Sequence, residues 1–437
     1  MVAEPLHLRI GLLGLGTVGG AVAEFIITRA ERITRLFDCH LELSRVLVRD
    51  RERRRSIALP PALVTTRVEE VIEDDSIDIV VEVIGGEEPA FSYMRTAIQR
   101  GKHLVTANKE VMAKHGRELL DLANQHGVDL YYEASVGGGL PLIGPFRRDL
   151  VANHISSVRA IINGTTNYIL SRMSREGIDF AVALEEAQAL GYAEVDPTND
   201  VDGHDAVYKL AILASLAFHT EILPHQIYRE GITQVTAKDF RYAHEMGYAI
   251  KLLAIAREMP TGIEARVHPA LIPQEQLLSE VNGVFNAVEI EGDLVGHVVL
   301  YGRGAGSFPT ASAIAGDLID LVRNIRKSVS NRIQAHIESG AHILPIEEVR
   351  TRFYLRLTVV DEPGVLAEIA SIFGELRISI AAFIQKEADI ERQSAEIIML
   401  THQAREAEIR RAVERLRQVH RIIEIGILLR LEDTPSE

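Results

Sequence analysis

A glycine pattern near the amino end constrains the fold of this chain more than any other feature. The apolar run 7–13 reads as a buried strand, and it leads directly into GLGTVG at 14–19 and then into a helical pattern. In this context Gly14 permits a tight turn, Gly16 lets the backbone approach a pyrophosphate, and Gly19 lets the helix pack on the strand. The sequence therefore predicts a Rossmann-type dinucleotide-binding domain, with a helix N-terminus facing the phosphates.

Strand and helix patterns alternate after this turn. Strands are predicted over 41–48, 77–84, 103–106 and 128–133, with a helix over 89–100. Such alternation predicts an α/β fold with a doubly wound parallel sheet. Ligands bind at the carboxyl ends of these strands, so we expect Asn108 and Lys109 to face cofactor and substrate. The alternative is that Lys109 lies on an ordinary surface loop.

The end of the second predicted strand bears on the choice of dinucleotide. An acid at this position holds the ribose hydroxyls of NAD, whereas an arginine accommodates the 2'-phosphate of NADP. Arg49 stands here and is followed by Asp50, with Arg51 and Arg53 nearby. Arg49 favours NADP, while Asp50 leaves NAD open. The arginines could also belong to a solvated loop.

Several glycine-rich turns follow in the middle of the chain. The segment 134–141 reads ASVGGGLP, 163–168 reads NGTTNY after a strand predicted over 156–162, and 302–306 reads GRGAG. A triple glycine after a strand indicates backbone that lies close to a ligand, an ion or another segment. The sequence alone does not show whether the neighbour is a ligand, an ion or another segment.

The segment 191–209, GYAEVDPTNDVDGHDAVYK, gathers acids at the start of an apolar helix. Asp205 and Lys209 are four residues apart, so they share one face of that helix, next to the apolar run 210–218. Partial burial can lower the pKa of a lysine and suit it to proton transfer near neutral pH. The alternative is a helix start whose acids interact with the helix dipole and form an ordinary salt bridge.

Composition excludes several classes of function. A chain of 437 residues is too long for one core, and its net charge of -15 argues against a nucleic-acid partner. The longest apolar run, 210–218, is too short to cross a membrane. The single cysteine, Cys39, rules out an internal disulfide framework, and no Cys/His cluster has zinc-ligand spacing. Since no charged leader precedes the first strand, we expect a soluble cytoplasmic protein.

The residues beyond 350 form a separate pattern. Strands are predicted over 352–359, 378–385, 394–401 and 422–431, with helices opening at 361–366 and over 405–417. This β-α-β-β-α-β order is that of a ferredoxin-like fold. The polar segment 327–350 before it reads as a connection.

Taken together, the sequence motifs of this chain resemble those of homoserine dehydrogenase of the bacterial type with a C-terminal ACT domain. The strings GLLGLGTVG, TANKE, EASVGGGLP, NGTTNYIL, GYAEVDPTNDVDGHDAVYK and GRGAGSFPT occur in the family's order over nearly the whole chain. The resemblance implies reversible NAD(P)H-dependent reduction of L-aspartate 4-semialdehyde to L-homoserine, in threonine, methionine and isoleucine biosynthesis. It implies a Rossmann domain (1–145 with a return helix 309–330), an α+β catalytic and dimerisation domain (146–308), a linker (327–350) and an ACT regulatory domain (351–432).

The resemblance also implies roles for individual residues. Lys209 matches the proton donor and acceptor, and Lys109 matches a second active-site lysine that sometimes shares this assignment. Glu194 and Asp205 match substrate-binding carboxylates, and Asp200 matches a supporting one. The implied cofactor contacts are Gly14, Gly16, Thr17, Val18, Gly19, Arg49, Lys109, Gly191, Glu194 and Gly306.

Two further sites and an assembly follow from the resemblance. A monovalent cation, Na⁺ or K⁺, is expected at Glu133, Val136, Gly138 and Leu140. An amino-acid effector, by analogy threonine, is expected at Asp361, Gly364, Val365 and Leu366, although the ACT domain could instead serve assembly alone. The resemblance implies a homodimer or a homotetramer.

Two rival hypotheses make different demands on the sequence. Another ACT-bearing dehydrogenase of amino-acid metabolism, such as a phosphoglycerate dehydrogenase, would need a His/Glu pair where this chain offers lysines. A catalytically inactive amino-acid sensor would be expected to lack Lys209 or Asp205, and both are present.

Overall fold

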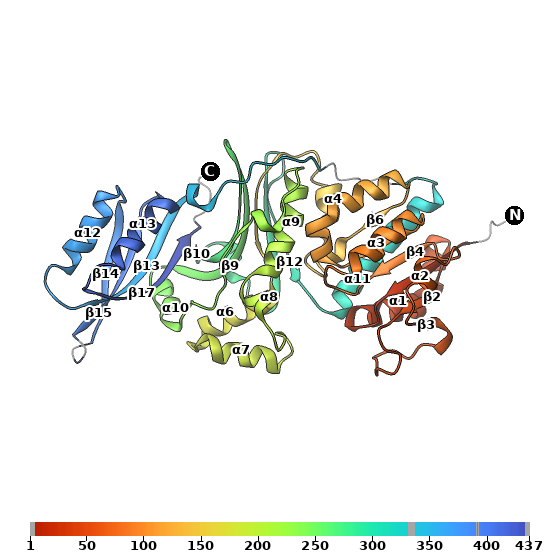
Figure 1. Cartoon of the computed structure of the whole chain (residues 1–437), viewed down its shortest axis with the longest axis horizontal. Helices are drawn as coiled ribbons and strands as arrows, with labels where there is room; N and C mark the ends of the chain where they lie inside the picture. Colours follow the sequence, from red (N-terminus) through yellow and green to blue (C-terminus); the bar gives the residue numbers. More distant parts are fainter. Residues whose placement is uncertain (1–4, 331–336, 390, 392, 433–437) are drawn as a thin grey trace. The chain divides into compact units, whose positions relative to one another are not determined.

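The computed structural model describes residues 5–330, 337–389, 391 and 393–432 of the chain (Figure 1). The chain divides into two compact units, and two of the boundaries between them fall within strand β7 (Ile155–Ile161) and helix α9 (His204–Ala217). Unit 1 comprises Met1–Val158, Tyr208–Gln226 and Phe285–Ala341, and unit 2 comprises Arg159–Val207, Ile227–Val284 and His342–Glu437. The domain boundaries expected from the sequence divide the chain differently and stay a prediction.

Unit 1 contains a six-stranded sheet in the order β3-β2-β1-β4-β5-β6. Every neighbouring pair is parallel, which confirms the predicted doubly wound sheet. Strand order reverses between β1 and β4, and ligands bind at such a switch point. The strands are β1 (Leu6–Leu13), β2 (Cys39–Leu47), β3 (Val64–Thr65), β4 (Ile79–Glu82), β5 (His103–Thr106) and β6 (Leu130–Tyr131).

Two strands are shorter than predicted: β4, for which the sequence predicted 77–84, and β6. The sequence predicted a strand over 128–133, but β6 ends at Tyr131, and Glu133–Ser135 form a single 3-10 turn, η2. The backbone leaves the extended region at Tyr132, where ψ is 28°. The Glu133 carboxylate instead faces the backbone amides of residues 142–144.

Helices from distant parts of the sequence pack on this sheet. Val22 and Ile26 of α1 share one hydrophobic core with Ile10 of β1 and with Ile314 and Leu318 of α11. The predicted return helix over 309–330 is therefore α11, which runs from 307 to 326. The helices are α1 (Thr17–Phe37), α2 (Glu69–Ile72), α3 (Ala90–Gln99), α4 (Lys109–Gln125), α5 (Ile143–Arg147) and α11 (Ser307–Arg326), with 3-10 turns η1 (Pro61–Leu63) and η3 (Pro224–Gln226). Strands β11 (Phe285–Gly292) and β12 (Gly296–Arg303) form an antiparallel hairpin.

Unit 2 contains a mixed sheet in the order β7-β9-β10-β17-β13-β15-β14. A long hairpin, β9 (Tyr248–Met259) and β10 (Gly262–Pro273), forms its centre. The other elements before residue 350 are α6 (Gly164–Glu176), α7 (Phe180–Ala189), α8 (Thr198–Val201), β8 (Tyr228–Arg229), α10 (Ala237–Glu245), η4 (Leu277–Glu280) and η5 (Ile346–Glu348). Residues 331–336 of the expected linker lie outside the described residues.

The last part of unit 2 has the predicted β-α-β-β-α-β order, and its helices α12 and α13 lie beside its strands (Figure 1). The elements are β13 (Arg350–Val360), α12 (Val365–Glu375), β14 (Ile380–Asp389), β15 (Ser394–Thr401), β16 (Ala404–Arg405), α13 (Glu406–Leu416) and β17 (Ile422–Leu431). The sequence did not predict that β17 pairs in parallel with β10, at Ala270–Arg430 and Leu271–Leu431. The two parts of unit 2 therefore share one sheet. No helix in the described residues is long and apolar enough to cross a membrane.

Candidate active site and cofactor cleft

A cavity of about 870 Å³ lies at the carboxyl ends of β1, β2 and β4 in unit 1. Gly14, Gly16 and Thr17 of the glycine turn line it. Gly14 has a φ of +104°, and a Cβ at Gly19 would lie 2.1 Å from the Gly14 carbonyl oxygen. A Cβ at Gly16 would meet nothing within 4 Å. The turn thus has the geometry expected for a dinucleotide site, with Gly19 acting through packing and Gly16 leaving room for a ligand.

The loop after β2 brings arginines to the same cavity, which is lined by Arg49, Arg53, Arg54 and Arg55. Arg55 donates hydrogen bonds to the carbonyl oxygens of Asp50 and Arg53 and so holds the loop together. The Asp50 carboxylate accepts a hydrogen bond from the Glu52 amide at 2.8 Å, which commits one of its oxygens to the loop itself.

Three of these arginines are available to a ligand. The side chains of Arg49, Arg53 and Arg54 form no hydrogen bond or ion pair with any residue that the structure describes. Guanidinium groups bind phosphate with paired hydrogen bonds, so this end of the cavity suits an anion.

Lys109 is the first residue of α4, directly after β5. Asn108 is the N-cap of this helix, and its side-chain oxygen accepts a hydrogen bond from the Val111 amide at 3.1 Å. The Asn108 side-chain amide donates to the carbonyl oxygen of Gly86, in the loop after β4, at 2.8 Å. The sequence placed Asn108 and Lys109 at a strand end, and the structure shows them there.

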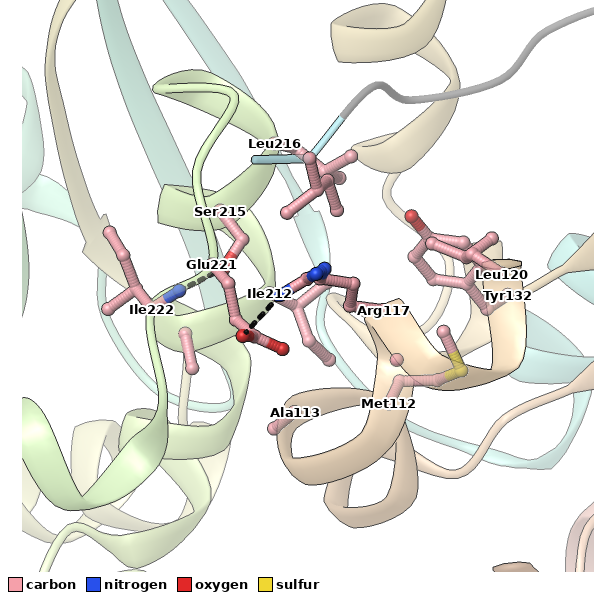
Figure 2. Close-up of a pocket in the computed structure, with 13 residues that line it drawn as sticks. Met112, Ala113, Arg117, Leu120, Tyr132, Ile212, Ser215, Leu216, Glu221 and Ile222 are labelled. Atoms are coloured by element: carbon pink, nitrogen blue, oxygen red, sulfur yellow. Dashed lines mark hydrogen bonds and ion pairs between the residues drawn. The ribbon is translucent and has the colours of Figure 1, made fainter. Parts of the chain in front are cut away.

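The helices that carry the two lysines, α4 and α9, pack against each other in unit 1 (Figure 2). The small cavity between them, of about 30 Å³, is lined by Met112 and Arg117 of α4 and by Ile212 of α9. Arg117 forms an ion pair with Glu221 at 3.2 Å, which Figure 2 shows as a dashed line. A cavity of this size has room for about one water molecule.

Residues beside the two lysines are also in contact. The Tyr208 hydroxyl donates to the Glu110 carboxylate at 3.4 Å, and Lys114 forms an ion pair with Glu110 at 2.7 Å. Lys114 also lies over the Tyr208 ring, 5.6 Å from its centre. The structure therefore brings the start of α4 close to the segment of α9 that contains Lys209.

Asp205 and Lys209 lie one turn apart on α9 and are only 3% and 8% exposed. In unit 2, the side-chain amide of Asn163 donates to Asp200 at 2.7 Å and to Asp205 at 2.8 Å. Asn163 is the N-cap of α6 and accepts from the Thr166 amide at 2.8 Å. One asparagine thus gathers two of the expected carboxylates.

Sequence reasoning missed Asn163 as a member of this site. The available signal was its position, because it directly follows a buried strand and opens a helix.

Glu194 behaves differently from Asp200 and Asp205: its side chain is exposed and forms no hydrogen bond or ion pair with any residue that the structure describes. Gly191 and Gly306 adopt positive φ angles of 74° and 127°, and neither lines the cavity in unit 1.

The expected cation site contains one carboxylate, that of Glu133. It accepts hydrogen bonds from the backbone amides of Leu142 at 2.5 Å, Ile143 at 2.8 Å and Gly144 at 2.6 Å. Burial raises the pKa of Glu133, although these three amides act in the opposite direction. Within the described residues, no group of three or more His, Cys, Asp or Glu side chains could hold a metal ion.

The backbone around the expected cation site is closely packed. Gly138 has a φ of +53°, and a Cβ there would lie 2.6 Å from the Gly304 carbonyl oxygen. In the described chain, the carbonyl groups of Val136, Gly138 and Leu140 accept no backbone hydrogen bond. Carboxylate and carbonyl oxygens are the kind of ligand that a hard cation takes.

The expected effector residues differ in exposure. Asp361 and Gly364 are exposed, and Gly364 has a φ of +96°. The Asp361 carboxylate accepts a hydrogen bond from the Gln385 side chain at 3.4 Å. Leu366 is 45% exposed, but Val365 is 2% exposed and belongs to the core between the sheet and α12. Only the backbone of Val365 can therefore face a ligand.

The strand order, the glycine turn and the arginine-lined cavity define a Rossmann-type dinucleotide-binding enzyme. Three family models match the chain: homoserine dehydrogenase, NAD binding domain, over 14–133; homoserine dehydrogenase over 141–319; and ACT domain over 353–421. The chain belongs to the homoserine dehydrogenase family of oxidoreductases, which act on a CH–OH group.

Similar proteins cover the whole chain. A homoserine dehydrogenase of Synechocystis is 44% identical over 98% of this chain and 100% of its own length. The crystal structure of a homoserine dehydrogenase from Thiobacillus denitrificans is 44% identical, with a TM-score of 0.91 and 98% of each chain covered. A hyperthermophilic archaeal homoserine dehydrogenase in complex with NADPH is 28% identical, with a TM-score of 0.62, over 73% of this chain and 98% of that one.

Proposed function

We propose that this protein interconverts L-aspartate 4-semialdehyde and L-homoserine, with Lys209 moving the proton and NADP(H) carrying the hydride. The observation that supports this most directly is the buried Lys209, one turn from Asp205, whose carboxylate is held beside Asp200 by Asn163. The reaction belongs to the biosynthesis of threonine, methionine and isoleucine. The single buried cysteine, Cys39, fits a reducing cytoplasm.

The chain's own residues supply binding and proton transfer. The dinucleotide, when bound, delivers a hydride to the aldehyde carbon. Negative charge then develops on the substrate oxygen, and a cationic Lys209 stabilises that charge and donates the proton. Asp205 and Asp200, with Glu194, offer a counter-charge to the substrate's α-ammonium group. Lys109, at the positively polarised N-terminus of α4, is the second candidate for the proton transfer.

The experiment that tests this role compares three proteins in the oxidation of L-homoserine. We expect Lys209→Ala to lower kcat by about 10²- to 10⁴-fold relative to the wild type. Lys327→Ala, an exposed lysine after α11, is the matched control and should keep the wild-type rate. Oxidation requires a neutral lysine, so the wild-type rate should rise toward alkaline pH. A Lys209→Ala enzyme that turns over homoserine at the wild-type rate would refute the proposal.

The arginine loop supports NADP as the preferred dinucleotide. Arg49, Arg53 and Arg54 line the cavity and have no side-chain partner in the described part of the chain, whereas the Asp50 carboxylate accepts a hydrogen bond from the Glu52 amide. Arg49→Ala and Arg54→Ala should raise the KM for NADP about ten-fold and leave the KM for NAD unchanged, because a lost phosphate contact removes roughly 1–3 kcal/mol. Arg51→Ala, which does not line the cavity, is the control.

A monovalent cation, Na⁺ or K⁺, is proposed at Glu133 with the carbonyl oxygens of Val136, Gly138 and Leu140. The free carbonyls and the single carboxylate support this choice of ligand. Activity and melting temperature should respond to NaCl or KCl but not to choline chloride. The Glu133→Gln enzyme should lose that response.

The ACT domain is proposed to bind an amino-acid effector, threonine, through the exposed backbone around Asp361 and Gly364. Threonine should then lower activity or shift the melting temperature. If it does neither, the domain serves assembly alone.

We also propose a homodimer or homotetramer. The edge strand β12 and its turn support this, since Leu294, Val295 and Tyr301 are 73%, 41% and 56% exposed. Sedimentation velocity distinguishes the two assemblies.

A further inference from the structure

A buried carboxyl group outside the proposed proton transfer lies at the switch point of the sheet. Glu82 is the last residue of β4, and it is 0% exposed. One carboxyl oxygen accepts hydrogen bonds from the backbone amides of Ile84 at 2.7 Å and Gly85 at 3.4 Å. Both of these residues line the cofactor cavity. Glu82 therefore determines the path of the loop that forms one wall of that cavity.

The second carboxyl oxygen of Glu82 points toward the neighbouring strand. It accepts a hydrogen bond from the Thr106 hydroxyl at 2.6 Å, and Thr106 is the last residue of β5. The Thr106 hydroxyl in turn accepts from the Asn108 amide at 2.9 Å. Asn108 caps the helix that begins at Lys109, so this chain of hydrogen bonds runs from Glu82 to the start of α4.

The Asn108 side chain completes the hydrogen-bond network between β4 and α4. Its amide donates to the carbonyl oxygen of Gly86, which belongs to the same loop that Glu82 holds through its first oxygen. Thr106 and Asn108 are 0% and 4% exposed, so water does not compete for these bonds. Burial raises the pKa of Glu82, and its hydrogen-bond donors oppose that shift. Glu82 forms no ion pair with any residue that the structure describes, and burying an acid without a charged partner costs free energy. A purely structural role therefore explains this acid poorly.

We infer that Glu82 is a positioning residue for the reaction: its carboxyl group fixes the cofactor loop and the start of the Lys109 helix relative to each other. This inference rests on the proposed roles of the cavity and of Lys109. Misplacement of a reacting group by about 1 Å can lower a rate by about a hundred-fold. A residue that holds two walls of the site through backbone contacts can therefore control the rate without touching a substrate.

The test uses Thr106→Val and Thr106→Ser, a matched pair that differs in the hydroxyl group, and Glu82→Met, which removes both acceptor oxygens. The control is Asp129→Asn, because Asp129 is a 2% exposed acid that precedes β6, at the opposite end of the same sheet. Four quantities are measured for each: the melting temperature of the free enzyme, the Kd for NADPH by fluorescence titration, and kcat and KM for L-homoserine.

We expect Thr106→Val and Glu82→Met to weaken NADPH binding and to lower kcat, each about ten-fold or more, while Thr106→Ser stays within about two-fold of the wild type. Asp129→Asn should lower the melting temperature without changing kcat or the Kd. The inference is overturned if Thr106→Val and Glu82→Met lower the melting temperature as Asp129→Asn does and leave both the Kd and kcat unchanged. A fully active Lys109→Ala enzyme would instead refute the role of Lys109, and the Kd would still decide the role of Glu82.

Discussion

Several acidic side chains have different partners in the two units: backbone amides or a hydroxyl in unit 1, and arginines in unit 2. In unit 1, Glu82, Glu133 and Asp317 accept hydrogen bonds from backbone amides or a hydroxyl, and burial raises the pKa of each. In unit 2, Glu432 and Glu230 face arginines. Burial acts to raise their pKa values as well, but the arginines outweigh it, so the pKa of Glu230 falls to about 2.

The arginines of unit 2 form a buried network where β10 meets β17. Arg266 donates to Glu432 at 2.5 Å, and Arg257 donates to the other oxygen of Glu432 at 2.8 Å. Arg430 contacts Glu230 at 2.8 Å and Glu406 at 2.5 Å. This network joins the last strand of the ACT part to the long hairpin, whereas Glu82 and Glu133 of unit 1 lie at sites proposed for ligands. The comparison indicates that acid–arginine pairs serve assembly in unit 2 and that acids held by backbone amides or a hydroxyl serve binding in unit 1.

The largest expected effect comes from removing one partner of the buried network. Arg430→Met removes the buried cation that contacts both Glu230 and Glu406 and leaves them with Arg410, whose side chain is 40% exposed. The expected loss of unfolding free energy is therefore at most about 3–5 kcal/mol, the cost of a buried charge that has no partner at all. Urea denaturation followed by circular dichroism measures this loss. The control is Arg415→Met, because the Arg415–Glu375 pair is 42% and 57% exposed and should contribute less than about 1 kcal/mol. Equal losses in the two variants would remove the basis of the comparison.

Replacing an acid by its amide in each unit sharpens the contrast. Glu432→Gln leaves Arg266 and Arg257 facing a neutral group and should destabilise the protein by about 3 kcal/mol. Glu133→Gln keeps one oxygen toward the backbone amides and should cost about 1 kcal/mol in the absence of added cation. Paired denaturation curves at neutral pH compare them. A larger loss for Glu133→Gln would show that the unit 1 acid is ionised.

The pH dependence of stability should also differ between the units. The pKa of buried His268 is lowered to about 3, first by burial and then by Arg430 and Arg266, and that of Glu230 is lowered to about 2. Both groups bind more protons in the unfolded chain, so stability should fall as pH drops from about 6.5 toward 3, by at most about 1.4 kcal/mol per pH unit for each proton. His268→Gln should flatten the part of this slope above pH 5. An unchanged slope would mean that His268 is already protonated in the folded protein.

Local signals in the sequence account for what could be predicted. The turn at 14–19, the strand alternation and the Asp205–Lys209 spacing each depend on neighbouring residues, and the structure has the predicted parallel sheet and the buried pair. The pairing of β10 with β17 could not be predicted, because nothing within the apolar run 422–431 indicates that Arg430 meets Glu230. Hydrogen bonds such as those of Asn163 depend on segments that only the fold brings together.

The smallest expected effect is at Asp317 of α11. Its carboxylate accepts a hydrogen bond from the Glu133 amide at 3.0 Å, and burial, reinforced by the charge of Glu133, raises its pKa well above the ordinary value. Such an acid binds more protons in the folded chain than in the unfolded chain, so stability should decrease as pH rises above the ordinary carboxyl pKa. Asp317→Asn keeps an oxygen acceptor and cannot ionise. It should change the unfolding free energy by less than about 0.5 kcal/mol at mildly acid pH and make the protein more stable than the wild type at alkaline pH. A variant that follows the wild-type curve throughout would show that Asp317 does not cause the loss of stability at rising pH. The comparison between the units would then rest on Glu82 and Glu133 for unit 1.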